Sequence, residues 1–274
     1  MGVDLAPSRG WRTLAASVVG TAHASAGLPC ADACAARVLR PRRGGSLLVA
    51  VAADGAGTSE RAPEGAQLAC AAVVQQAERW AGRASDPSTF GREDFIPWLS
   101  KARKRIARAA RAQRRESRDF SCTLLVALVG EARAAFFQIG DGAIVYRGAG
   151  GAYVPALWPQ TGEYANCTWF VTDDDAAQRV QTVAAEGVDE VALLTDGLQG
   201  LALRFGTREA HGPFFEPMFA RLRAEGEGEP EGLREELRAF LGSPPVNRRT
   251  DDDKTLVLAT RLLPAAGEGV EGEA

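Results

Sequence analysis

The sequence predicts an α+β protein in which helices pack outside a pair of β-sheets. Strand-like and helix-like segments occur in separate blocks, in the order strands, helices, strands, helices, strand, which argues against alternating βαβ units. Glycine-containing breaks separate short apolar runs in the second half of the chain, as in antiparallel sheets. The residues are 46% hydrophobic and 24% charged, close to the globular average, so the chain can bury a sizeable core.

The first half of the chain predicts two strands and then two helices. Residues 11–20 are rich in β-branched and small residues and predict a first strand, followed by a loop over 21–33. The run SLLVAVAA at 46–53 is continuously apolar and ends at Asp54-Gly55, which is the pattern of a buried strand closed by a tight turn. Apolar residues then recur near a 3.6-residue period, predicting helices over 64–83 and 95–115 with a connection over 84–92.

The second half returns to strands. Short apolar runs predict them at 122–129, 134–139, 143–147 and 190–195, with hairpin turns at Gly-Asp-Gly (140–142) and Gly-Ala-Gly-Gly (148–151). Helical patterns follow at 213–223 and 232–241, and a last strand at 255–261. We expect one domain over residues 1–264 and a disordered tail over 265–274.

Composition excludes several classes of function. A net charge of -3 gives no special affinity for nucleic acid, and no apolar stretch is long enough to cross a bilayer. The first twelve residues lack the apolar middle of a signal peptide, so a cytoplasmic protein is expected. Two histidines, and five cysteines without a CxxC pair, exclude a zinc site of several imidazoles, a zinc knuckle and a disulfide framework.

Aspartates at strand ends are the candidate chemistry. Asp54 follows SLLVAVAA, Asp196 follows VALLT, and Asp252 precedes TLVLAT, so each carboxylate is predicted at the edge of a sheet. One Asp-Gly pair is explained equally well by a turn, because aspartate caps turns and glycine adopts positive φ. Three such pairs beside strands, Asp54-Gly55, Asp141-Gly142 and Asp196-Gly197, together with the triple aspartate at 251–253, favour a site for Mg²⁺ or Mn²⁺, which carboxylate oxygens suit. Two such cations a few ångströms apart lower the pKa of a shared water and offset charge on a phosphate monoester.

The order of these motifs resembles the metal-dependent protein phosphatases of the protein phosphatase 2C family, in a bacterial subgroup. The similar segments are ADGAG (53–57), SCTLL (121–125), IGDGAIV (139–145), LLTDG (193–197) and DDDKTLVLA (251–259), and the stretch GTAHASAGLPCADA (20–33) is similar to the subgroup. The resemblance covers residues 11–263. It implies a four-layer α-β-β-α sandwich with two central antiparallel sheets, which agrees with the block order.

The resemblance also implies a role for each aspartate. In the family's DGxG motif the aspartate bridges two metals and the glycine offers its carbonyl, which assigns these roles to Asp54 and Gly55. Asp196 and Asp252 match two further metal-binding aspartates, whereas Asp251 is one residue out of register. Asp32 keeps one acid of an early Glu-Asp pair and is expected to reach metal through water. Asp141 is expected at a third, weaker metal.

The substrate side of the predicted site departs from the family. Many members place an arginine upstream of the early acidic pair to clamp the phosphate, but the nearest basic residue upstream here is Arg12. His23 lies in the corresponding loop. It could donate to a phosphate oxygen, or act as general acid for the leaving alkoxide, or be a structural histidine bonded within its loop.

Two other patterns leave alternatives open. The run KARKRIARAARAQRRESR at 101–118 is either a solvated helix face or a docking surface for an acidic or phosphorylated partner, whose binding would weaken with salt. It lacks the interleaved aromatic residues of a nucleic-acid surface. Phe214, Phe215, Met218 and Phe219 lie at helical spacing, which favours core packing over a partner groove.

The leading hypothesis is a phosphoserine/phosphothreonine protein phosphatase that uses two Mn²⁺ or Mg²⁺ ions, with a possible third, and opposes a bacterial Ser/Thr kinase. The rival is a catalytically silent module of the same fold that recognises a phosphorylated or partner protein, motivated by the missing early glutamate and the missing arginine. Like charges repel when held together without cations, so the retained aspartates argue against the rival.

Overall fold

Two five-stranded antiparallel sheets form the centre of the molecule in a computed structural model, which describes residues 10–42, 45–83, 87–160, 168–225 and 230–262. The first sheet has the order β1 (Trp11–Val18), β12 (Lys254–Arg261), β9 (Val188–Leu194), β6 (Ala143–Gly148) and β7 (Val154–Leu157). The second has the order β2 (Ala33–Leu39), β3 (Leu47–Ala53), β4 (Leu124–Val129), β5 (Arg133–Ile139) and β8 (Gln181–Glu186). A small hairpin pairs β10 (Leu203–Arg204) with β11 (Glu209–Ala210).

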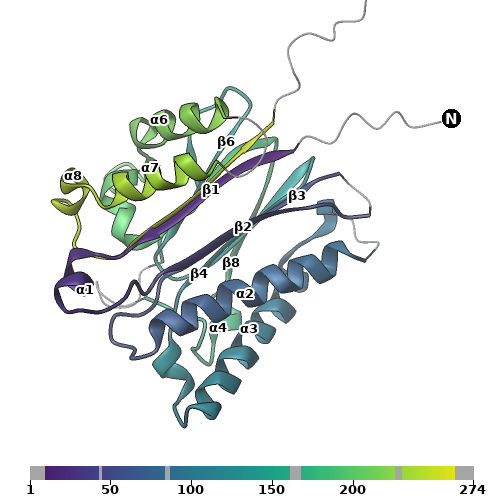
Figure 1. Ribbon diagram of the computed structural model, residues 1–274. Helices are drawn as coiled ribbons and strands as arrows, with labels where there is room; N and C mark the ends of the chain where they lie inside the picture. Colours follow the sequence, from purple (N-terminus) through teal and green to yellow (C-terminus); the bar gives the residue numbers. More distant parts are fainter. Residues whose placement is uncertain (1–9, 43–44, 84–86, 161–167, 226–229, 263–274) are drawn as a thin grey trace, which may run out of the picture.

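Helices cover the outer face of each sheet (Figure 1). The long pair α2 (Ala62–Ala81) and α3 (Arg92–Ala112) packs on the second sheet, and the pair α6 (Gly212–Arg223) and α7 (Glu231–Leu241) packs on the first. Shorter helices are α1 (Thr21–Ser25), α4 (Ala176–Arg179), α5 (Gln199–Ala202) and α8 (Pro244–Asn247), with 3-10 turns η1 (Pro87–Thr89), η2 (Ser117–Phe120) and η3 (Asp196–Leu198). The predicted α-β-β-α sandwich is therefore confirmed.

Strand β3 shows why the apolar runs lack a polar face. Every residue of β3 is buried, because alternate side chains serve two different cores. Val49 and Val51 face α2 and α3, whereas Leu48 and Ala50 face the first sheet. A strand buried on both faces reads as a continuous hydrophobic run, so the interpretation of 46–53 as a buried strand is confirmed.

Three strands of the two large sheets, the small β10–β11 hairpin and two connections differ from the sequence expectation. Strands β2, β7 and β8 were not predicted, and each lies at the edge of its sheet, where partly exposed residues weaken the hydrophobic pattern. The predicted loop over 21–33 contains the short helix α1. The prediction of a hairpin at Gly-Asp-Gly (140–142) is wrong: β5 and β6 belong to different sheets, so Asp141 lies where the chain crosses between them.

Two expectations concern residues outside the described ranges. The predicted disordered tail (265–274) and Cys167 both lie there. The four cysteines within the described ranges are free thiols, of which Cys70 and Cys122 are buried. None of the described helices combines the length and the apolar character that a membrane span requires.

Candidate metal and phosphate site

One edge of the sandwich collects the candidate aspartates. Asp54 follows β3 and Asp196 follows β9, while Asp32 precedes β2 and Asp252 lies just before β12. The registers Ala33↔Ala53 and Leu256↔Leu194 bring these strand ends together within each sheet, and Asp141 joins the two sheets at the same edge. This edge lies near α1, at the opposite end of the molecule from the first and last described residues (Figure 1).

Asp54, Asp141 and Asp196 form the tightest group. Each offers a carboxylate oxygen, and the three oxygens lie within 4.8 Å of one another. Two oxygens that bind one Mg²⁺ at about 2.1 Å lie up to about 4.2 Å apart, so only a small contraction is needed. The sequence analysis placed Asp252 at the centre and Asp141 outside it, whereas the geometry places Asp141 with the central pair.

Mutual repulsion and burial raise the pKa of these carboxyl groups. Burial raises the pKa of Asp54 well above its ordinary value, and the charges of Asp32 and Asp196 raise it further. Burial and the charge of Asp196 raise the pKa of Asp141 to about 6. The pKa of Asp252 is raised by burial and then by Asp196. Like charges held together in this way are stabilised by a cation.

Two buried carboxylate oxygens without a hydrogen-bond partner among the described residues show that the site fits a metal. Within the described part of the chain, Oδ1 of Asp32 and Oδ1 of Asp196 are buried and accept no hydrogen bond. A buried acceptor without a donor costs free energy of about 1–3 kcal/mol. Directly bound cations, or waters bound to them, are the partners that a cluster of carboxylates can take, so the residues present fit divalent metal.

Asp32 is positioned by the threonine that precedes Asp196. The Thr195 hydroxyl accepts a hydrogen bond from the Thr255 backbone N–H (3.0 Å) and donates to Oδ2 of Asp32 (2.8 Å). This interaction leaves Oδ1 of Asp32 as the unpartnered atom. Burial raises the pKa of Asp32, while hydrogen bonds from the side chains of Thr255 and Thr195 oppose that rise.

The triple aspartate separates into three different environments. Asp251 is exposed, and its carbonyl accepts the Ala22 N–H at 2.9 Å. Asp252 is also exposed, but it interacts with Asp196, and its carboxylate accepts the Asp253 N–H at 2.8 Å. Asp253 is 2% exposed. The charge of Asp252 therefore acts on the cluster.

Asp253 also lies at this site, although the sequence pattern assigned no role to it. Its carboxylate accepts the backbone N–H groups of Gly20 (2.6 Å) and Ala31 (2.5 Å), and it lies 2.9 Å from Nδ1 of His23. It therefore fixes both ends of the loop that carries His23. The available signal was its place in the similar segment at 251–259, directly after Asp252.

Three glycines allow the site loops to approach one another. A Cβ on Gly197 would lie 2.0 Å from the carbonyl oxygen of Asp253, and one on Gly20 would lie 2.2 Å from the carbonyl carbon of Asp252. Real Cβ atoms do not approach that closely. Gly55 forms an isolated bridge with Cys122, and a Cβ there would meet the Ala31 carbonyl oxygen at 2.7 Å.

Arg12 does not reach this site. It pairs with Thr260 at the far end of β1, whereas Val18 at the near end pairs with Lys254. Six residues of strand separate Arg12 from Val18, about 20 Å. Arg12, the nearest basic residue upstream in the sequence, is therefore too far away to hold a phosphate at the carboxylates. His23 is the candidate donor next to them.

A groove of about 820 Å³ lies beside the Asp141 crossing. Trp158, Trp169 and Phe205 are among its lining residues, with guanidinium groups of Arg179 and Arg208 over the two tryptophans. Gln160 connects it to the site, because its side-chain oxygen accepts the Gly140 N–H at 2.6 Å. Polar and aromatic surface thus adjoins the metal-site candidate.

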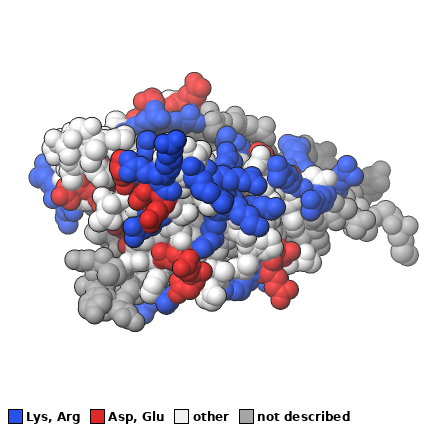
Figure 2. Space-filling model, turned by 90° about the horizontal axis from the view of Figure 1, so that it is seen from below, with Lys and Arg blue, Asp and Glu red and all other residues white. Residues whose placement is uncertain are grey.

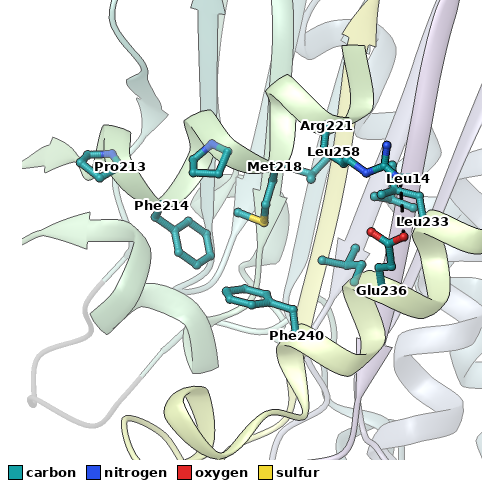
Figure 3. Close-up of a pocket in the computed structure, with 11 residues that line it drawn as sticks. Leu14, Pro213, Phe214, Met218, Arg221, Leu233, Glu236, Phe240 and Leu258 are labelled. Atoms are coloured by element: carbon teal, nitrogen blue, oxygen red, sulfur yellow. Dashed lines mark hydrogen bonds and ion pairs between the residues drawn. The ribbon is translucent and has the colours of Figure 1, made fainter. Parts of the chain in front are cut away.

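A second groove, of about 360 Å³, lies between α6 and α7 (Figure 3). Phe215 and Phe219 are fully buried, in agreement with the core prediction, whereas Phe214 and Met218 line this groove with Phe240. It lies on the outer face of the first sheet and contains none of the candidate aspartates.

Comparisons with known proteins agree with this geometry. Residues 19–242 match the model of the family described as protein phosphatase 2C. The chain is 40% identical over 252 residues to serine/threonine-protein phosphatase 3 of Escherichia coli (strain K12), an alignment that covers 91% of this chain and 98% of that protein.

Solved structures share the fold at lower identity. The serine/threonine phosphatase Stp1 from Staphylococcus aureus is 13% identical with a TM-score of 0.62, covering 95% of this chain and 98% of that one. The catalytic domain of the serine/threonine protein phosphatase PstP, solved in complex with two manganese ions, is 16% identical with a TM-score of 0.59, covering 93% of this chain and 100% of that one.

Proposed function

The chain belongs to the protein phosphatase 2C family and is a serine/threonine protein phosphatase, and on that premise we propose that it removes phosphate from phosphoserine and phosphothreonine of proteins with two Mn²⁺ or Mg²⁺ ions as cofactors. The observation that carries this proposal is the group of Asp54, Asp141 and Asp196, whose oxygens lie within 4.8 Å of one another. The unpartnered, buried oxygens of Asp32 and Asp196 support it.

Four carboxylates would hold the metals. Asp54, Asp141, Asp196 and Asp252 are the direct ligands in this proposal, with the Gly55 carbonyl beside Asp54 and Asp32 acting through water. When bound, divalent cations supply a water of lowered pKa and positive charge that offsets the phosphoryl oxygens in the transition state. Thr195 holds Asp32 in one orientation for this purpose, through its 2.8 Å hydrogen bond.

His23 is proposed on the leaving-group side. With Nδ1 held by Asp253, the Nε2 atom is the ring nitrogen left for substrate. A protonated imidazole donates from both nitrogens, so Nε2 can give its proton to a phosphoryl oxygen or to the departing alkoxide of serine or threonine. The side chain is 21% exposed, which leaves it accessible.

The substrates proposed are proteins phosphorylated by a Ser/Thr kinase. The test is phosphate release from phosphothreonine and phosphoserine peptides with manganese or magnesium, at several pH values, with EDTA as the metal-free control. The expected result is metal-dependent release that Asp54→Asn abolishes. Release that persists in EDTA, or no release with either metal, would reject the proposal.

A further inference from the structure

The solvent face of α3 carries a row of cations, here called the basic stripe. Its members are Lys101, Lys104, Arg105, Arg108 and Arg111, all exposed, and each has another member three or four residues away. That spacing places them along one side of a helix, and the opposite side buries Phe95, Leu99, Ala102, Ile106 and Ala110. Figure 2 shows Lys and Arg gathered across the face of the molecule that α2 and α3 form.

The stripe has no acidic partner in the part of the chain that the structure describes. Other arginines of α3 are used to anchor the helix: Arg92 donates to the carbonyls of Ala177 and Val180, and Arg103 donates to that of Val171. The stripe side chains form no ion pair with a described carboxylate. Like charges three and four residues apart repel, so this arrangement destabilises the helix slightly. This row of cations is explained if an external anion offsets the repulsion between them.

The stripe leads toward the carboxylate site. Just beyond its C-terminal end, Arg115 forms an ion pair with Glu60 at 2.5 Å, and the Ser59 hydroxyl donates to the Arg118 carbonyl at 2.9 Å. Residues 56–60 directly follow Asp54 and Gly55, and Ala56 N–H donates to the Ser121 carbonyl at 2.9 Å. The stripe and the metal-binding loop are thus neighbouring parts of one surface.

Charge balance at the site gives the stripe a role. Five carboxylates gather there, those of Asp32, Asp54, Asp141, Asp196 and Asp252, and they exceed the charge of two divalent cations. Arg12, the candidate clamp, lies at the far end of β1. A row of cations outside the site adds attraction for a negatively charged substrate and raises the encounter rate at low salt.

We propose that the basic stripe is a docking surface for an acidic segment of the phosphorylated protein substrate, a proposal that rests on the proposed function. From Lys101 to Arg111 the helix rises about 15 Å, which matches about five residues of extended chain. A protein segment is favoured over nucleic acid or membrane, because α3 exposes no large apolar or aromatic side chain that could stack on a base or enter a bilayer.

The test compares two phosphothreonine peptides that differ only in a tail joined through a flexible spacer. One tail has five aspartates and the other five asparagines, with versions that place the tail on either side of the phosphothreonine. At low salt the wild type should show a kcat/KM about 3- to 10-fold higher for the aspartate tail in one orientation. The advantage should shrink between about 50 mM and about 300 mM salt.

Two double variants of equal charge locate the effect. Lys104→Glu/Arg108→Glu should lose the preference for the aspartate tail, while Arg221→Glu/Arg238→Glu on the opposite helix layer should keep it. Thermal unfolding establishes that both variants are folded. Equal kcat/KM for the two tails in the wild type, or an equal loss in both variants, overturns the docking proposal.

A binding measurement separates this proposal from the proposed function. Fluorescence anisotropy of an unphosphorylated aspartate-tailed peptide needs no catalysis, and the stripe variant should bind it at least about threefold more weakly than the wild type. Tighter, stripe-dependent binding of single-stranded DNA, or of vesicles containing phosphatidylserine, would overturn the choice of an acidic protein segment. Absence of phosphate release with intact anisotropy binding would count against the phosphatase proposal alone.

Discussion

Nδ1 of His23 lies 2.9 Å from Oδ2 of Asp253, a carboxylate that is 2% exposed and that also accepts two backbone N–H groups. The pair joins residues 230 positions apart in the chain. Because a buried aspartate fixes one ring nitrogen, the other nitrogen has a defined direction. The histidine side chain is therefore bonded to a distant segment rather than within its own loop, and Nε2 is the nitrogen through which it could donate a proton.

The first prediction follows from that pair. His23→Ala should lower kcat for a phosphothreonine peptide by about 10²-fold, the usual contribution of general acid catalysis. The same variant should change turnover of p-nitrophenyl phosphate much less, because p-nitrophenolate leaves without needing a proton. The measurement is steady-state kinetics on both substrates with saturating manganese.

A matched variant checks the direction of the effect. His23→Gln keeps a hydrogen-bonding side chain without an acidic proton, so it should be as slow as His23→Ala on the peptide if proton donation matters. Unchanged turnover of the phosphopeptide by His23→Ala eliminates the catalytic role and leaves a structural histidine.

The second prediction concerns which late aspartate binds metal. Asp252 interacts with Asp196, whereas Asp251 is exposed and its carbonyl accepts the Ala22 N–H. Asp252→Asn should weaken manganese binding by at least about tenfold, the lower end of losses for groups that support a metal site. Asp251→Asn should leave affinity within about twofold of wild type.

Isothermal titration calorimetry with manganese measures both variants, with Asp54→Asn as the reference for a disrupted site. Equal losses in the Asp251 and Asp252 variants would show that the register assigned from the motif is wrong. Wild-type binding by Asp54→Asn would remove the basis for the metal site and favour a silent binding module.

Sequence reasoning located the aspartates but not their arrangement. A continuous apolar run predicts a buried strand such as β3, and the residue at the end of such a run is easy to identify. Which strand ends meet depends on pairing between distant segments, so Asp141 could not be placed next to Asp54 and Asp196 from the pattern alone. The hairpin expected at 140–142 failed for the same reason.

Asp253 and β2 illustrate two further limits. The role of Asp253 consists of contacts with Gly20, Ala31 and His23, all far away in sequence, so no local pattern carries it. Strand β2 is an alanine-rich edge strand with Arg37 exposed, and its pairing with all seven residues of β3 overrides its weak intrinsic preference.

The third prediction concerns pH and the metal-free protein. Burial and like charges raise the pKa of Asp141 to about 6 from an ordinary value near 4. Between these values the folded protein binds more protons than the unfolded chain, so this group makes the free energy of unfolding fall as pH rises. Its raised pKa therefore destabilises the metal-free protein above about pH 6, and has no effect below about pH 4.

Asp141→Asn isolates this contribution. In EDTA the free energy of unfolding of the variant should exceed that of the wild type at pH 7.5 by up to about 3 kcal/mol. This difference should become smaller toward pH 4.5. With manganese the order should reverse at pH 7.5, because the variant lacks a ligand and gains less from binding. Chemical denaturation at both pH values, with and without metal, measures these differences. A gap in EDTA that does not vary with pH contradicts the electrostatic origin.

The last prediction concerns the close approach of two site loops. A Cβ on Gly197 would lie 2.0 Å from the carbonyl oxygen of Asp253, a backbone atom that cannot rotate away. Gly197→Ala should therefore push the 252–253 segment outward, lower the free energy of unfolding by about 2–4 kcal/mol and weaken manganese binding. Gly200→Ala is the matched control. Residue 200 lies in the short helix α5, and a Cβ there meets nothing within 4 Å. This control should be neutral or more stable by up to about 1 kcal/mol, since alanine is the better helix former. If both variants lose the same stability and the same affinity, crowding against Asp253 is not what requires glycine at 197.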